Sequence, residues 1–214
     1  MPTDAFAFNA PIRKELTKQL KEKYSEDELK YLFSSIFKIR RVQPVNSNMQ
    51  DLINHLEQRN IPAIALTEWW TGKHGYITEM EKFRFKYLQQ VDISFINTSP
   101  FKEDMISPEF KNKDGIPMLK SGVILTASAD KGLVLKTLFW KNQIYILKRL
   151  FLLESVEKIC HELNIDFQGI HYGAAKIASL PILDKENEQL RYEILEKEHI
   201  WLLDKELEER FKSK

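Results

Sequence analysis

The chain has 214 residues, of which 43% are hydrophobic, and its 32 Lys and Arg residues balance 31 Asp and Glu residues. Seven Gly and eight Pro residues argue against long disordered tracts, and the interleaving of both charge signs argues against a nucleic-acid partner. No apolar run reaches the roughly 18 residues of a membrane span. The single cysteine, Cys160, cannot form an internal disulfide, and no signal-peptide pattern begins the chain. We therefore expect a globular protein in the reducing cytoplasm.

The first segment, residues 1–47, is predicted to be a helical lead-in or cap. The tetrapeptide SEDE at 25–28 has the pattern of a capping box, in which a serine and a glutamate satisfy the first amides of a helix. Apolar residues then recur at helical spacing from Leu29 to Ile36. The pattern predicts a helix that begins beside Ser25, within a helical region over 11–40.

The central segment, residues 48–180, alternates helix-like and strand-like stretches. Asn48 and Asp130 are both placed to cap helices. The strand-like runs lie at 63–67, 93–96, 123–126, 144–147 and 167–170. This alternation is typical of an α/β fold with a mostly parallel sheet flanked by helices. Residues 97–118, rich in Pro, Gly and charge, are predicted to be a surface insertion.

The last segment, residues 181–214, carries a charged amphipathic pattern. Leu190, Ile194, Trp201 and Leu202 recur through residues 187–211 at spacings that favour one helix. We expect this helix to pack on a face of the sheet.

Two side chains stand where a parallel sheet binds ligands. Thr67 ends one strand-like run, and Lys131 opens the helix after another. The carboxyl ends of parallel strands meet at one edge, where a hydroxyl, an ammonium group and the amides of a helix start can hold a phosphate oxygen. The sequence therefore predicts a phosphate-binding pair, Thr67 and Lys131. The alternative is that Thr67 only ends a strand and Lys131 is a solvated side chain in a first helical turn.

Other residue types indicate no second chemistry. The five histidines lack metal-ligand spacing, which argues against a zinc site. The neighbouring Trp69 and Trp70 are expected to pack rather than to stack on a ligand.

Four stretches of the chain resemble a known superfamily. They are the strand that ends at Thr67, residues 120–136, the residues LESVE at 153–157 and the residues NIDFQGIHY at 164–172. Through them the chain resembles the haloacid dehalogenase (HAD-like) superfamily and, more closely, a bacterial family catalogued as domain of unknown function 2608. The resemblance implies a Rossmann-like fold and magnesium-dependent phosphoryl transfer. In that scheme Thr67 matches the second motif and Lys131 matches the lysine that steadies the phosphoryl group.

The resemblance also exposes two missing motifs. The superfamily attacks phosphorus with the first aspartate of an Asp-x-Asp motif, and no Asp-x-Asp occurs in this sequence. Where its fourth motif supplies carboxylates for Mg²⁺, this chain has Lys148 and Arg149, whose positive charges repel a metal. We therefore expect no catalytic residue set, no metal site and no cofactor in the chain as given, with Mg²⁺ as the cofactor of a complete site.

The strand that carries the first motif, central in the superfamily's sheet, is also missing from the sequence. Three explanations stay open: an upstream start that has been missed, a decayed gene, or flanking strands that pair around a rearranged core.

The leading functional hypothesis is a degenerate, inactive member of this phosphohydrolase superfamily. One alternative is a magnesium-dependent phosphatase, if an upstream Asp-x-Asp strand exists. Another is a non-catalytic module that binds a phosphorylated small molecule, and a third is a protein-interaction module built on the helices at 11–40 and 187–211. None of these predicts a membrane partner.

Overall fold

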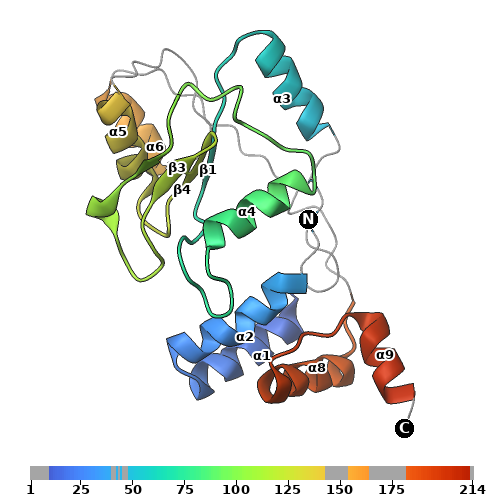
Figure 1. Cartoon of the computed structure of the whole chain (residues 1–214). Helices are drawn as coiled ribbons and strands as arrows, with labels where there is room; N and C mark the ends of the chain where they lie inside the picture. Colours follow the sequence, from blue (N-terminus) through green and yellow to red (C-terminus); the bar gives the residue numbers. More distant parts are fainter. Residues whose placement is uncertain are drawn as a thin grey trace. The chain divides into compact units, whose positions relative to one another are not determined.

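The chain folds into two compact units, shown in Figure 1 as a computed structural model. The structure describes residues 10–39, 42, 44, 48–142, 154–163 and 182–212. The helical unit comprises Met1–Val45, Lys73–Thr78 and Ala174–Lys214, and the sheet unit comprises Asn46–Gly72 and Glu79–Gly173. The two ends of the chain, which are separate segments in the sequence pattern, thus belong to one unit.

The helical unit contains helices from both ends of the chain. They are α1 (Pro11–Lys23), α2 (Glu26–Ile39), α8 (Lys185–Glu198) and α9 (Asp204–Lys212). Apolar side chains at helical spacing on three of these helices, with Trp201 between α8 and α9, form its core. The buried members are Leu16, Leu20, Leu29, Leu32, Ile36, Tyr192, Leu195 and Trp201.

The predicted capping box at the start of α2 is confirmed. The Ser25 amide and hydroxyl donate to Glu28 Oε2 over 2.8 and 2.7 Å, and the Glu28 amide donates back to Ser25 Oγ over 3.4 Å. These bonds satisfy backbone groups that the first turn leaves unpaired. They also hold the pKa of the Glu28 carboxyl below its usual range.

The prediction of one helix over 187–211 is wrong, because the chain turns between α8 and α9. His199 ends α8 in a left-handed conformation with φ 55°, and its amide donates to Leu195 O. The turn brings Trp201, which is 2% exposed, into the helical core. Within the helical unit, α8 packs on α1.

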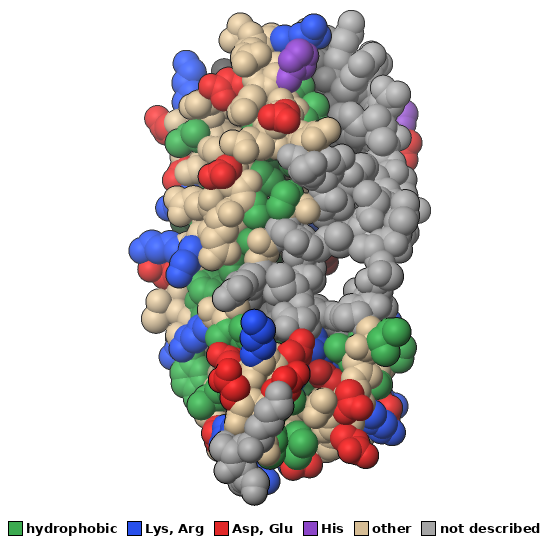
Figure 2. Space-filling model, turned by 90° about the vertical axis from the view of Figure 1, so that its right-hand side faces the viewer, with side chains coloured by type: hydrophobic (Ala, Val, Ile, Leu, Met, Phe, Trp, Pro, Cys, Tyr) green, Lys and Arg blue, Asp and Glu red, His purple; other side chains and the backbone are tan. Residues whose placement is uncertain are grey.

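Charged side chains of both signs cover α8 and α9 on the face shown in Figure 2. Among the charged side chains of these helices, Arg210 and Glu198 form a two-bond pair, with N–O distances of 3.0 and 2.6 Å.

The described part of the sheet unit contains a sheet of four short strands in the order β1-β4-β3-β2. β1 (Ala65–Thr67) and β4 (Val123–Leu125) are parallel, whereas β3 (Met118–Lys120) pairs antiparallel with both β4 and β2 (Met105–Ile106). The expected α/β architecture is confirmed, but the described sheet is mixed rather than mostly parallel. The predicted strands at 144–147 and 167–170 lie outside the described residues.

Two further segments of the sheet unit differ from the sequence pattern. Residues 93–96 form no strand, because Phe95 O accepts from the Ser99 amide within a turn. Residues 97–118 contribute β2, the 3-10 helix η2 (Pro108–Phe110) and the start of β3.

Helices α3 (Met49–Gln58), α4 (Met80–Gln89), α5 (Lys131–Asn142) and α6 (Glu154–Glu162) flank the sheet, and α5 and α6 lie side by side (Figure 1). Asn48 stands at the N-cap of α3 but makes no capping bond with its side chain. Among the described residues, none of the helices has the length and apolar character to cross a membrane.

The core of the sheet unit lies between the sheet and the α5–α6 pair. Its buried members are Phe101, Leu119, Ile124, Val134, Leu135, Leu138, Phe139, Val156 and Cys160. Cys160 therefore lies on the core face of its helix, as expected, and burial raises the pKa of its thiol. Because side chains alternate along a strand, Val123 and Leu125 point to the face opposite Ile124.

Candidate functional site at the carboxyl edge of the sheet

The two residues predicted to hold phosphate lie at the same edge of the sheet. Thr67 is the last residue of β1, and it stands opposite Leu125, the last residue of the parallel strand β4. The Thr126 amide extends this pairing by donating to Thr67 O over 2.8 Å. Five residues further along, Lys131 is the first residue of α5. The parallel pairing therefore directs both residues to the edge at which α/β proteins bind ligands.

Glu68, the residue after β1, forms an ion pair with Lys131 at the start of α5. Its Oε2 atom lies 3.5 Å from Lys131 Nζ. The Lys131 side chain is only 19% exposed, whereas that of Glu68 is 68% exposed. Because ion pairs with a solvated carboxylate are weak, the Lys131 ammonium can exchange Glu68 for another anion at a small cost in free energy. The sequence pattern did not predict this pair. The one feature of the sequence that could have indicated it is the position of Glu68 directly after Thr67.

The loop from Thr126 to Asp130 determines where α5 begins. Ala127 and Ser128 have φ values of 46° and 61°, a left-handed conformation that costs about 1–3 kcal/mol for each such residue. Hydrogen bonds from outside the loop hold it, because the Ala127 amide donates to Trp69 O and Asn112 Nδ2 donates to Ala127 O. The backbone at the helix start is therefore preorganised.

Two side chains complete this loop. Asp130 Oδ1 accepts from the Leu133 amide over 2.8 Å, which confirms the predicted cap of α5. The Thr126 hydroxyl is buried and has no hydrogen-bond partner among the described residues. Because buried hydroxyls are normally paired, Thr126 is a further candidate for contact with a ligand oxygen, which the sequence pattern did not indicate.

Trp69 packs on α4. Its Nε1 atom donates to Met80 O over 2.9 Å, its ring meets that of Tyr87 at an edge, and the Arg84 guanidinium lies 5.1 Å from the ring centroid. These contacts give Trp69 a structural role at the end of β1.

The described carboxylates at this edge do not fit a magnesium site. Mg²⁺ in proteins takes an octahedral set of oxygens that includes one or two carboxylates. Here Glu68 is paired with Lys131 and Asp130 caps α5. No group of three His, Cys, Asp or Glu side chains suited to a metal occurs in the part of the chain that the structure describes. Lys148 and Arg149 lie outside the described residues.

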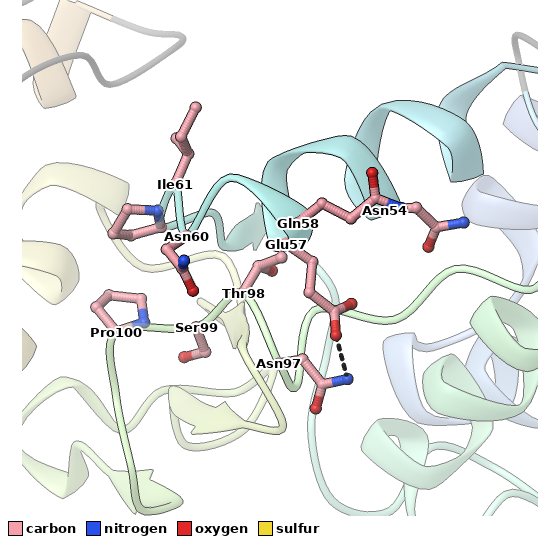
Figure 3. Close-up of a pocket in the computed structure, with 10 residues that line it drawn as sticks. Asn54, Glu57, Gln58, Asn60, Ile61, Asn97, Thr98, Ser99 and Pro100 are labelled. Carbon is pink, nitrogen blue, oxygen red and sulfur yellow. Dashed lines mark hydrogen bonds between the residues drawn. The ribbon is translucent and has the colours of Figure 1, made fainter.

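A separate cleft of about 700 Å³ lies near the opposite end of β1 (Figure 3). Asn54, Glu57 and Gln58 of α3 line it together with the segment from Asn97 to Pro100, and Asn97 Nδ2 donates to Glu57 Oε1 over 3.0 Å. The described lining contains carboxamides, hydroxyls and one carboxylate, but no Lys or Arg. This charge pattern disfavours phosphate, so the cleft is distinct from the predicted site.

The sequence matches the model of one protein family. Residues 3–208 match the family described as protein of unknown function (DUF2608). No curated protein and no solved structure matches the chain. Because the family match extends over nearly the whole sequence, the chain belongs to the DUF2608 family.

Proposed function

We propose that this chain is a HAD-like scaffold that binds a phosphorylated small molecule at Thr67 and Lys131 and does not hydrolyse it. The observation that supports this proposal is the parallel pairing of β1 and β4, which directs Thr67 and the start of α5 to one edge of the sheet. There the Lys131 ammonium already attracts an anionic group, the Glu68 carboxylate. A phosphate dianion carries more charge than this carboxylate and accepts more hydrogen bonds.

The absence of hydrolysis follows from charge. Phosphoryl transfer by this superfamily requires an anionic attacker and carboxylates that hold a divalent cation. The sequence contains no Asp-x-Asp motif, and the two described carboxylates of this edge are Glu68, beside Lys131, and Asp130, which caps α5. In this proposal the hydroxyl, the ammonium group and the helix amides bind an anion, and no carboxylate attacks it.

Binding is tested by thermal unfolding of the full chain in millimolar inorganic phosphate without magnesium. Ligand that binds only the folded state raises the melting temperature. We expect a phosphate-dependent rise that is lost in Thr67→Val and in Lys131→Met. Lys158→Met, which removes an exposed lysine from α6, is the matched control and should keep the rise. An equal response of all three variants would refute the site.

Catalysis is tested separately with an aryl phosphate and Mg²⁺. We expect no turnover above that of the buffer. Turnover that is abolished by Thr67→Ala or Lys131→Ala would overturn the proposed inactivity and favour a magnesium-dependent phosphatase.

A further inference from the structure

A second groove of about 390 Å³ lies between α4 and the turn that joins β3 to β4. Its volume is within the range of small-molecule pockets, which is about 300–1,000 Å³. All of its lining residues belong to the sheet unit, and none belongs to the carboxyl edge described above.

The floor of the groove is apolar. Phe85 and Leu88 of α4 contribute to it with Phe95, Ile96 and Val123. Val123 is 2% exposed and belongs to β4, whereas Ile96 is 60% exposed although it is a large aliphatic side chain. An exposed isoleucine beside partly buried aromatic rings provides a surface on which a hydrocarbon chain can be desolvated.

Close backbone packing keeps the floor in place. Gly122 has φ 76°, and a Cβ atom at this position would lie 2.3 Å from Phe95 O. The turn between β3 and β4 therefore rests directly on the segment that carries Phe95 and Ile96. The groove is part of the packed structure rather than a gap between loose loops.

The rim of the groove is cationic. Lys82, Lys86 and Lys120 line it, and the described lining contains no acidic side chain. Lys82 and Lys86 are one helical turn apart, on the same face of α4 as Phe85, so that α4 places apolar and cationic groups side by side. Lys86 is exposed.

Acidic residues outside the lining contact the other two lysines. Lys82 Nζ lies 2.6 Å from Glu79 Oε2, and Lys120 Nζ lies 3.8 Å from Asp104 Oδ2. All four side chains are at least 41% exposed, so these pairs are weak and can yield to a ligand anion.

We infer that this groove binds a free, single-chain anionic amphiphile, a fatty carboxylate, with its hydrocarbon chain on the apolar floor and its carboxylate among the three lysines. An apolar floor with a cationic rim favours an anionic amphiphile over a neutral one, because a neutral ligand forms no ion pair with the lysines. A groove of this volume suits one chain rather than the two chains of a phospholipid. This inference is independent of the proposed phosphate site.

The test is isothermal titration calorimetry of the full chain with decanoate, below its micelle concentration, and with decanol. We expect decanoate to bind in a one-to-one complex and decanol to bind at least tenfold more weakly. Changing Lys82, Lys86 and Lys120 together to Gln should weaken decanoate binding at least tenfold. The matched control, Lys102→Gln with Lys111→Gln, removes exposed lysines outside the groove and should leave binding unchanged.

Two further measurements test where the hydrocarbon chain binds and whether the ligand is a free amphiphile or a membrane lipid. Ile96→Asp adds a like charge at an exposed position and should abolish decanoate binding while circular dichroism shows a folded protein. The inference is overturned if folded wild-type chain binds no decanoate, if decanol binds equally well, or if the control variant loses as much affinity as the groove variant. The inference is also overturned if the protein sediments with anionic phospholipid vesicles but does not bind decanoate.

Discussion

The Arg13 guanidinium and the Glu188 carboxylate, 175 residues apart in the sequence, form a two-bond ion pair inside the helical unit. Arg13 Nε lies 2.6 Å from Glu188 Oε2, and Nη2 lies 3.0 Å from Oε1. A second guanidinium, that of Arg191, lies 3.4 Å from Glu188 Oε1, and all three side chains are at most 2% exposed. Both guanidinium groups also lie over the Trp201 ring, at 5.3 and 5.4 Å from its centroid.

Glu188→Gln is therefore expected to destabilise the helical unit strongly. The change removes the carboxylate that pairs with buried Arg13 and contacts Arg191, which also pairs with Asp204. Breaking a buried pair in this way costs about 3–5 kcal/mol. Urea unfolding followed by circular dichroism measures the loss. Glu186→Gln, at an exposed position two residues earlier in α8, is the control and should lose at most about 1 kcal/mol. Equal losses in both variants would show that the buried pair is not required.

Glu68→Gln is expected to tighten phosphate binding by up to about fivefold. The carboxylate competes with phosphate for the Lys131 ammonium, and an exposed pair of this kind is worth about 0.2–1 kcal/mol. Titration with inorganic phosphate at low ionic strength measures the change, which should shrink as salt is added. Weaker phosphate binding by the glutamine variant would contradict the role of Glu68 as a competitor.

Gly132→Ala is expected to weaken the packing of α5 on α6. A Cβ atom at this position would lie 2.3 Å from Ser155 O and 3.0 Å from Ile159 Cγ1, so one helix must shift. Overpacking typically costs about 1–3 kcal/mol, against a gain of about 1 kcal/mol from the helix propensity of alanine. Urea unfolding should show a net loss. Leu133→Ala, at a side chain that is 47% exposed, is the control with a small effect. Net stabilisation by Gly132→Ala would mean that the two helices are further apart.

The capping box of α2 makes stability depend on pH. Hydrogen bonds from the Ser25 side chain and backbone lower the pKa of Glu28 in the folded state. This contribution is present above the pKa of an unfolded glutamate, about 4.3, and is lost as the pH falls through the lower folded pKa. Stability measured by urea unfolding between pH 5 and pH 3 should therefore fall less steeply in Glu28→Gln than in the wild type. Glu15→Gln, an exposed change on α1, should keep the wild-type slope.

Local features of the fold were predictable because their partners lie within a few residues. The Ser25 box and the Asp130 cap each join a side chain to an amide three residues away, so the sequence contains both partners in the right spacing. The positions of Thr67 at a strand end and Cys160 on a core face follow likewise from short-range periodicity.

Features that depend on distant partners were not predictable in this way. The sequence pattern indicated neither the pair between Glu68 and Lys131 nor the buried hydroxyl of Thr126. The antiparallel strands β2 and β3 lie within a stretch whose prolines and charges resemble a loop, and they form because β4 offers a free edge for hydrogen bonding.

By itself, the sequence determined the α/β class, the starts of α2 and α5 and the lack of an Asp-x-Asp nucleophile, because each of these is a property of neighbouring residues or of composition. Only the tertiary structure decided that the two ends of the chain form one helical unit and that Arg13 pairs with Glu188. The physical reason is that a buried charge is tolerated only beside a counter-charge, and burial depends on how all the helices of the unit pack together.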